Sequence, residues 1–244
     1  MSGHSKWANI KHRKSKSDAQ KGQVFTKLGR EIQLAVRSGG PDPDVNSRLK
    51  DLIAKARGSN MPGDSIQRSI RKAAGSEDNE QIEEITYEGY GPAGIALMIR
   101  AMTDNRNRTA GDVRHMLDKY GGNLGTTGCV SFLFHEKGVI LASREDSPGD
   151  GDESAAMMDA LEAGAEDFDA SEDLFEIYTP PQDFYVVREA LEKKGYAIAD
   201  SSIRMVPITW VRVEDPEVRE KMEKMLEVLE EHDDIQEVFH NWET

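Results

Sequence analysis

The sequence predicts an α+β protein in which a small all-helical domain precedes two domains of mixed helices and strands. Two observations support this prediction. Before residue 76, apolar residues recur at the three- and four-residue spacing of amphipathic helices, whereas after residue 81 short runs rich in β-branched and aromatic residues alternate with helical segments. The chain of 244 residues is long enough for one large domain or for two to three small ones.

Three helices are expected between residues 18 and 75. The first begins at Asp18, which is suited to an N-cap, and ends at Gly39; the second is closed by Gly58, and the third is capped by Asn60. The side chains expected to face inward are Phe25, Leu28, Ile32, Ala35, Leu49, Leu52, Ile53, Ala56, Ile66, Ile70 and Ala73. These positions predict a three-helix domain with its own core.

The pattern changes after residue 81. "EEITYEGYGPAGIALMIRAMT" predicts strand, turn and strand, followed by a helix that Asn107 or Thr109 caps. "CVSFLFHEKGVILAS" is interpreted as a hairpin around Lys137-Gly138. Further helices are expected in "DESAAMMDALEAGA", "PQDFYVVREALEKKG" and "PEVREKMEKMLEVLEEH", and further strands in "LFEIYTP", "DSSIRMVP", "ITWVRV" and "IQEVFHNW".

The number of strands indicates how these segments combine. Residues 82–125 supply two strands and a helix, which is too little for an independent sheet. The strand, helix and strand at the C-terminus would complete a four-stranded sheet with two helices, and the segment between them would form an inserted domain. The expected division is a flexible arm, a helical domain, a discontinuous α+β domain and an inserted α+β domain, both of ferredoxin-like type: residues 1–17, 18–77, 78–128 plus 207–244, and 129–206.

Charge is distributed unevenly along the chain. The whole sequence has 31 Lys and Arg against 45 Asp and Glu, a net charge of −14. Residues 1–75 have 16 basic and 6 acidic residues, a net charge of +10, and residues 76–244 have 15 and 39, a net charge of −24. Such asymmetry is typical of a nucleic-acid-binding arm on an acidic body.

Several classes of protein are disfavoured by composition. The longest apolar run, Ile95 to Ile99, is far shorter than the ~20 residues that cross a bilayer, so no membrane association is expected. The first residues lack the apolar stretch of a secretory signal. A single cysteine, Cys129, cannot form an internal disulfide, which fits a cytoplasmic protein.

The basic arm is the first candidate site for nucleic acid. Its cations can neutralise phosphates, Trp7 can stack on a base, and Asn9 and His12 can form hydrogen bonds. The candidate residues of the arm are Lys6, Trp7, Asn9, Lys11, His12, Arg13, Lys14 and Lys16. The alternative is a solvated tail, or one folded back against the acidic domains.

Two further groups of cations extend this candidate site. Lys21, Lys27 and Arg30 lie largely away from the apolar stripe of the first helix, and the same residues could equally form an ordinary exposed face. In "TDNRNRT", Arg106 and Arg108 stand at a strand-to-helix turn, where Arg can bind phosphate. The alternative there is that neighbouring polar residues cap the helix while the arginines pair with carboxylates.

No pattern indicates an enzyme or a metal site. Cys129 has His115 and His135 near it in sequence, but it lies in the apolar run "CVSFLF", which favours a buried, inert thiol. The acidic loop "REDSPGDGDES" lacks the ligand spacing of a calcium loop, and the histidines lack zinc spacing. We therefore expect no catalytic residue, no metal and no cofactor.

Segments from both ends of the chain resemble the YebC/PmpR family. They are "GHSKWANIKHRKSKSDAQKGQVFTKLGREI", "EGYGPAGIALMIRAMTDNRNRT", "GGNLGTTGCVSFLF", "ALEAGAED" and "DDIQEVFHNW". The resemblance implies an N-terminal helical domain followed by two α+β domains, the middle one completed by the C-terminus. It also implies a transcriptional regulator that binds DNA, although a mitochondrial translational activator of cytochrome c oxidase subunit I is a relative. Cys129 departs from the Ser that is common in the family.

These observations together predict a nucleic-acid-binding regulator of gene expression. The first hypothesis is a DNA-binding transcriptional regulator that acts through the basic arm and the helical domain. The second is a ribosome-associated translation factor that binds ribosomal or transfer RNA, because a Lys-rich tail suits RNA cavities equally well. The third is a protein-interaction module whose acidic α+β domains bind a protein partner.

Overall fold

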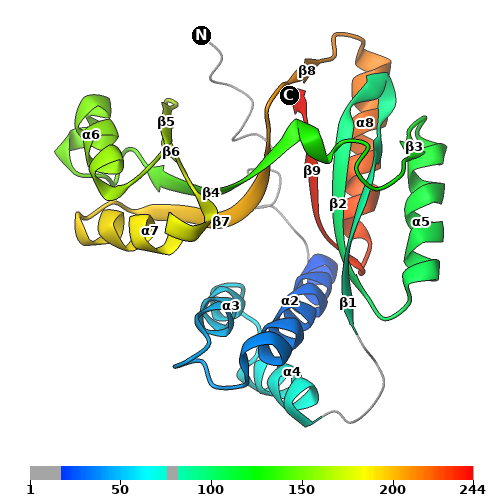
Figure 1. Cartoon of the computed structure of the whole chain (residues 1–244), viewed down its shortest axis with the longest axis horizontal. Coiled ribbons are helices and arrows are strands. Elements are labelled where there is room, and N and C mark those ends of the chain that lie inside the picture. Colours follow the sequence, from blue (N-terminus) through cyan, green and yellow to red (C-terminus); the bar gives the residue numbers. More distant parts are fainter. Residues whose placement is uncertain (1–17, 76–81, 244) are drawn as a thin grey trace. The chain divides into compact units, whose positions relative to one another are not determined.

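The computed structural model describes residues 18–75 and 82–243, with side chains from residue 22 onward. The described chain forms two compact units. The first unit consists of residues 18–75, 82–130 and 213–240, and the second of residues 131–212 and 241–243. Both units combine helices with mainly antiparallel sheets, which confirms the predicted α+β class. Figure 1 labels the elements.

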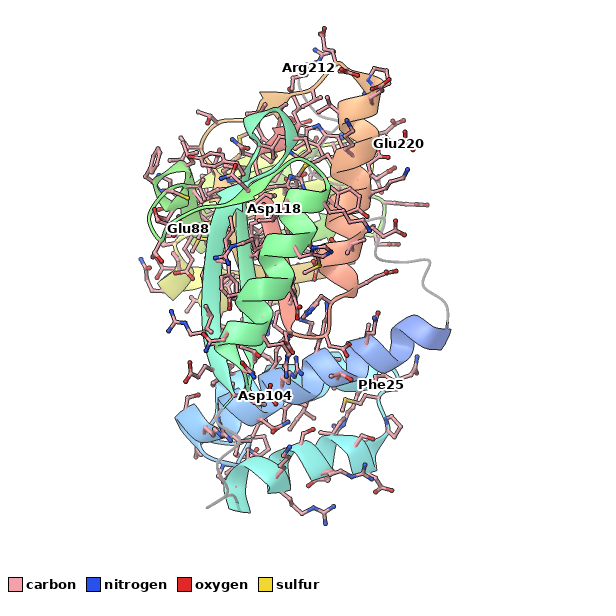
Figure 2. All side chains as sticks on the ribbon, turned by 90° about the vertical axis from the view of Figure 1, so that its right-hand side faces the viewer. Phe25, Glu88, Asp104, Asp118, Arg212 and Glu220 are labelled. Carbon is pink, nitrogen blue, oxygen red and sulfur yellow. The ribbon has the colours of Figure 1, made fainter. Side chains whose placement is uncertain are left out.

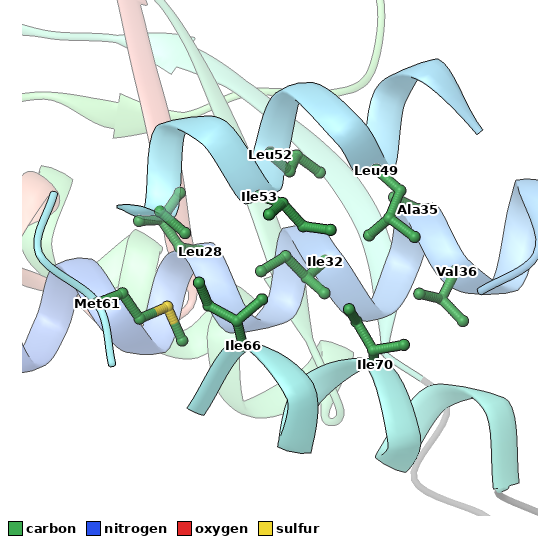
Figure 3. Packing of buried hydrophobic residues seen from close by; sticks show 11 residues of the cluster. Leu28, Ile32, Ala35, Val36, Leu49, Leu52, Ile53, Met61, Ile66 and Ile70 are labelled. Atoms are coloured by element: carbon green, nitrogen blue, oxygen red, sulfur yellow. The ribbon is translucent and has the colours of Figure 1, made fainter. Parts of the chain in front are cut away.

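The first unit begins with three helices: α2 (Asp18–Gly39), α3 (Ser47–Gly58) and α4 (Gly63–Gly75). Their apolar stripes meet in one core, in which Ile32 of α2 lies between side chains of α3 and α4 (Figure 3). The buried members are Leu28, Ile32, Ala35, Val36, Leu49, Leu52, Ile53, Ala56, Met61, Ile66 and Ile70. Phe25 and Ala73 are partly buried against them. The predicted inward residues therefore form this core.

Asn46 joins the first two helices. Its Oδ1 accepts a hydrogen bond from the Leu49 amide at 3.0 Å and so caps α3, while its Nδ2 donates to the carbonyls of Ala35 and Gly40, each at 2.8 Å. Asn60, in contrast, does not cap the third helix as predicted. It has a φ of 60°, and α4 begins only at Gly63, so Asn60 belongs to the turn, where Asn tolerates the left-handed conformation.

An antiparallel sheet completes the first unit, with strand order β3-β1-β2-β9. Its elements are β1 (Glu83–Tyr90), β2 (Ala96–Thr103), α5 (Arg106–Lys119), β3 (Asn123–Leu124), α8 (Pro216–Glu231) and β9 (Ile235–His240). Strand β9 pairs with β2, with Ile99 opposite Val238, so the end of the chain completes a sheet that begins near residue 83.

The fourth strand of this sheet is not the predicted one. The short β3 takes that place, with Gly89 opposite Leu124, whereas "ITWVRV" forms only β8 (Val211–Arg212). β8 pairs in parallel with β10 (Trp242–Glu243) in the second unit. The small size of β3 explains why the sequence pattern did not indicate it.

The second unit is built on the sheet β5-β6-β4-β7. Its elements are β4 (Phe134–Ser143), α6 (Glu153–Ala163), β5 (Asp167–Ala170), β6 (Leu174–Thr179), α7 (Phe184–Lys193) and β7 (Ile198–Pro207). Ile140, Phe175 and Ile177 of the sheet pack against Ala160 of α6 and Val187 of α7. The sequence pattern had not indicated β5.

The hairpin predicted around Lys137-Gly138 is wrong, because β4 runs through both residues as one strand. Gly138 lies between Thr179 of β6 and Ile203 of β7. A Cβ at this position would lie 2.7 Å from Cδ2 of Phe184 in α7, so the glycine permits the close approach of a helix to the sheet and does not mark a turn. Among the described residues, no helix is long and apolar enough to cross a membrane.

Candidate nucleic-acid interface

The outward face of α4 is basic. Ile66 and Ile70 point into the helical core, and Arg68, Arg71 and Lys72 lie on the opposite side of the helix at three- and four-residue spacing. All three cations are exposed. A row of cations on one helix face attracts a phosphate backbone without requiring a particular base sequence.

Helix α3 adds four exposed cations to the same domain: Arg48, Lys50, Lys55 and Arg57. Lys55 lies 3.9 Å from the carboxylate of Glu31, which is too long for a strong ion pair at an exposed site. Residues 22–75 have 10 Lys and Arg against 5 Asp and Glu, so the described helical domain has a net charge of +5. The helical domain therefore has basic surface apart from the arm.

The predicted arm residues lie outside the described residues: Lys6, Trp7, Asn9, Lys11, His12, Arg13, Lys14 and Lys16. Lys21 belongs to α2, but its side chain is also outside the described part. Nucleic-acid binding by these residues stays a prediction. The remaining candidates, Lys27, Arg30, Arg106 and Arg108, are all described.

Lys27 binds the C-terminal end of α8. Its Nζ donates to the carbonyl of Glu230 at 2.6 Å, and Gln23, one turn earlier in α2, donates to the carbonyl of Glu231 at 2.8 Å. The last carbonyls of a helix have no partner within the helix, and they lie at the negative end of the helix dipole. Gln23 and Lys27, on one side of α2, therefore cap the C-terminal end of α8.

Arg30, about one turn further along α2, contacts the turn between α8 and β9. Its Nη1 lies 2.7 Å from Oδ1 of Asp234, 2.6 Å from the carbonyl of Asp233 and 3.1 Å from the carbonyl of Met102. Asp234 is only 2% exposed, so this ion pair is largely shielded from solvent. Arg30 thus connects the helical domain with the end of the sheet.

Arg108 reaches the same carboxylate from α5. Its Nη2 donates to Oδ2 of Asp234 at 3.0 Å and to Oδ1 of Asp104 at 2.8 Å. The buried hydroxyls of Thr103 and Thr109 also donate to Oδ2 of Asp234, at 3.2 Å and 2.7 Å. Figure 2 shows Asp104 at the end of the sheet that lies next to α2. We call these contacts the Asp234 joint: those of Gln23 and Lys27 with the C-terminal end of α8, and those of Arg30 and Arg108 with the turn before β9.

The joint holds Asp234 in its ionised form. Burial opposes ionisation, but hydrogen bonds from Thr109 and Arg108 and the charge of Arg30 outweigh it and lower the pKa of Asp234 to about 2. The carboxylate is therefore charged at neutral pH and is balanced by two arginines. Its role in the fold is to bind groups from three elements, α2, α5 and the end of β2.

Asn105, rather than the predicted Asn107 or Thr109, is the N-cap of α5. Its side chain accepts from the Arg108 amide at 3.1 Å, and the helix begins at Arg106. Arg106 is exposed, and no ion pair of its guanidinium is found within the described residues. Of the two arginines in "TDNRNRT", Arg106 therefore faces solvent and Arg108 binds carboxylates.

An open cleft of about 420 Å³ lies at the joint. It is lined by Gln23, Arg30, Arg108, Glu231, His232, Asp233 and Asp234. The lining includes three acidic residues and two arginines, so the cleft has no surplus of positive charge for a polyanion. The basic faces of α3 and α4 suit phosphates better.

Asp234 was not among the candidate residues. The signal available in the sequence was the pair of aspartates between the last helix and the last strand, in "HDDIQEVF". A pair of acidic residues at such a turn is common, and only the folded chain brings it to Arg30, some two hundred residues earlier. Its partners could not be derived from local sequence.

Cys129 is only partly buried, so the burial predicted for its thiol is incomplete. Burial, together with the negative charge of Glu88, raises the pKa of its thiol. The buried carboxylate of Glu88 accepts hydrogen bonds from the amides of Gly128 at 2.7 Å and Val130 at 2.9 Å, which fixes the loop around the cysteine.

The acidic loop 144–153 has structural contacts of its own. Asp146 accepts from the hydroxyl of Ser143 at 2.9 Å, and Asp152 caps α6 by accepting from the Ala155 amide at 2.8 Å. In the part of the chain that the structure describes, no group of three or more His, Cys, Asp or Glu side chains is placed to hold a metal ion.

The fold and the charge distribution define a class: a multidomain α+β protein with a basic helical domain. Two family models match the chain, the TACO1/YebC protein N-terminal domain over residues 5–76 and the TACO1/YebC second and third domain over residues 82–242. The chain belongs to the TACO1/YebC family, which confirms the YebC/PmpR resemblance of its sequence.

Known relatives match this chain over almost its whole length. A protein of Acetivibrio thermocellus is 58% identical over 99% of both chains, and one of Ruminiclostridium cellulolyticum is 56% identical over 100% of this chain and 97% of the relative. Both are named "Probable transcriptional regulatory protein". The crystal structure of a conserved hypothetical protein from Aquifex aeolicus is 48% identical and has a TM-score of 0.86, covering 97% of this chain and 96% of the other.

Proposed function

We propose that this protein is a nucleic-acid-binding regulator of gene expression that binds DNA as a transcriptional regulator, through its basic N-terminal arm and helical domain. One observation supports the proposal above all: residues 1–75 have a net charge of +10, while the rest of the chain has a net charge of −24. A polyanion is attracted to the first part and repelled by the second, which restricts contact to a local footprint.

Within the helical domain, the exposed cations of α4 are the proposed phosphate contacts, together with those of α3. Residues 59–62 join α3 and α4, which is the length of a helix-turn-helix connection. In that motif the second helix enters the major groove, a place that the basic outward face of α4 would suit. The names of the curated relatives, which describe transcriptional regulatory proteins, agree with this proposal.

The arm and Lys21 complete the proposed interface, and Arg106 is an additional exposed candidate. Lys27, Arg30 and Arg108 belong to the predicted set as well, but each binds oxygens of the protein itself at the Asp234 joint. Contact with phosphate by these three would require sharing or breaking those bonds. The protein is proposed to act in the cytoplasm by binding, without a catalytic step or a cofactor.

Salt dependence of binding tests the role of the arm. If the arm makes about six phosphate contacts, affinity for a duplex DNA should fall ~10³-fold between 50 and 200 mM salt. A variant lacking residues 1–17 should lose most of this slope. An unchanged slope would contradict the proposed role of the arm.

A second candidate function is a ribosome-associated translation factor that binds ribosomal or transfer RNA. The strongly acidic body favours it, because acidic domains repel the phosphates of a long duplex, whereas an arm can enter an RNA cavity alone. Crosslinking in cells, followed by sequencing of bound DNA and RNA, distinguishes the two. Enrichment at promoters supports the transcriptional role, and enrichment on ribosomal RNA with ribosome cosedimentation supports the translational one.

A further inference from the structure

Two helices of the second unit expose large apolar side chains. Met158 is 64% exposed, Leu161 52% and Met157 39% on α6, and Val186 is 66% and Tyr185 42% exposed on α7. We call these five residues the α6–α7 patch. Isolated exposed apolar residues are ordinary, and what distinguishes these five is that they come from two helices that contact each other.

The patch lies on the side of the helices that the core does not use. Ala156 and Ala160 of α6 pack into the core of the unit, and Met158 and Leu161 lie on the outward side of the same helix. Helix α6, with the sequence ESAAMMDALEA, is therefore apolar on both sides. A helix that is apolar on both sides is usually buried on both sides, so the outward side of α6 is a candidate binding surface for another molecule.

The two helices are firmly attached to one another, so the patch is a defined surface. Lys194, just after α7, donates to Asp159 of α6 at 2.5 Å and to Glu162 at 3.0 Å. The hydroxyl of Tyr196 donates to the second oxygen of Asp159 at 2.8 Å. Figure 1 shows α6 and α7 as the two helices of this unit. Methionine side chains on such a rigid support can adapt to different apolar partners.

Charge identifies the kind of partner. Residues 131–212 have 7 Lys and Arg against 18 Asp and Glu, a net charge of −11. Around the patch, α6 and α7 with Lys194 have five acidic and three basic residues, and the three cations form ion pairs with four of these carboxylates, so most of the negative charge belongs to the rest of the unit. Nucleic acid and the anionic surface of a membrane are repelled by this charge, and a second copy of the same surface would be as well. A basic protein segment is attracted.

We propose that the α6–α7 patch is a docking surface for a basic, amphipathic helix of another protein. The apolar side of that helix would cover Met158, Leu161 and Val186, and its Lys and Arg residues would face the surrounding carboxylates. None of the five residues of this patch belongs to the proposed nucleic-acid interface, so that the protein could connect a nucleic acid with a basic protein.

Fluorescence anisotropy with three labelled peptides tests the proposal on the full chain. The first peptide is a Lys/Leu amphipathic helix about 18 residues long. The second has Ser in place of Leu, and the third has Glu in place of Lys. The Lys/Leu peptide should bind most tightly, because only it matches both the apolar and the charged features of the surface. Equal binding of either comparison peptide would overturn the proposal.

The double variant Met158→Ser with Leu161→Ser locates the binding. Both side chains are exposed, so the fold should persist, and affinity for the Lys/Leu peptide should fall roughly tenfold. Val45→Ser is the matched control, because Val45 is 77% exposed but belongs to the first unit. The affinity of this variant for the peptide should equal that of the parent.

The proposal fails if the double variant binds the Lys/Leu peptide as tightly as the parent does. It also fails if sedimentation shows a dimer that the double variant dissociates, because the occupant would then be a second copy.

Discussion

Two groups of cations in the helical domain have opposite surroundings. Lys27 and Arg30 of α2 contact carbonyls and a buried carboxylate of the same chain, whereas Arg68 and Arg71 of α4 are exposed on the side opposite the core. The residue types are the same and the helices belong to one core. The comparison shows that a basic residue in the sequence is not by itself evidence for a phosphate site. The folded chain can supply carbonyl or carboxylate oxygens that bind the same cation.

The comparison separates two roles for charge. At the Asp234 joint, charge attaches a helical domain to a sheet through polar contacts, since the apolar core of α2–α4 includes no residue of the sheet among its members. On α4, Arg68 and Arg71 are exposed, and they belong to the proposed phosphate contacts. Stability should therefore respond to changes at the joint, and the salt dependence of binding should respond to changes on α4.

The largest effect is expected for Asp234→Ala. The change leaves Arg30, and the hydroxyls of Thr103 and Thr109, without their shared acceptor, so the free energy of unfolding should fall by about 3–5 kcal/mol. Urea unfolding of the full chain measures it. The control is Asp233→Ala, because Asp233 is exposed and contributes its carbonyl to the joint; this variant should stay close to the parent. Equal effects of the two changes would show that Asp234 is not the anchor.

The pH dependence of stability sharpens the same point. The pKa of Asp234 is lowered from 3.8 to about 2, so the unfolded chain takes up a proton at higher pH than the folded chain does. The stabilisation is therefore complete above pH 4 and is lost as the pH falls toward 2. The stability difference between the parent and Asp234→Asn should shrink over that window, and a difference that is constant there would contradict the assignment.

Lys27→Ala should have a smaller effect. It removes one charge-assisted hydrogen bond to the C-terminus of α8, with a cost of about 1 kcal/mol in the free energy of unfolding. The slope of nucleic-acid affinity against salt should not change, because Lys27 binds the protein's own carbonyl. A slope reduced by about one contact would place Lys27 on the ligand instead.

The double variant Arg68→Ala with Arg71→Ala should leave stability within about 0.5 kcal/mol of the parent. Its expected effect is on binding: the slope of log affinity against log salt should become shallower by about two phosphate contacts. Filter binding with duplex DNA and with single-stranded RNA of equal length measures this. An unchanged slope for both ligands would remove the α4 face from the proposed interface.

Local patterns predicted the helices well because periodicity reports burial directly. The inward residues of α3, such as Leu49 and Leu52, were predicted from spacing alone and are buried. The hairpin around Gly138 failed because a glycine in a strand has two explanations, a turn or a close approach. The contact between position 138 and Phe184, which decides between them, arises only from tertiary packing.

The candidate site was less predictable than the fold for the same reason. The sequence showed that Arg106 and Arg108 stand at a strand-to-helix turn, and it left open whether they bind phosphate or carboxylate. In the structure Arg108 binds the carboxylate of Asp234, which lies 126 residues further along the chain. Long-range partners of this kind leave no periodic signal in the sequence.

The position of β9 at the edge of its sheet affects how the protein is made. The three helices precede the sheet in the chain and can assemble around their own core, while β2 obtains β9 as a neighbour only after residues 131–212 and α8 have been made. Asp234 directly precedes β9, so the contact between Arg30 and Asp234 forms only after α8 has been made. A chain that lacks β9 would therefore have its helical core beside a sheet in which β2 is an open edge.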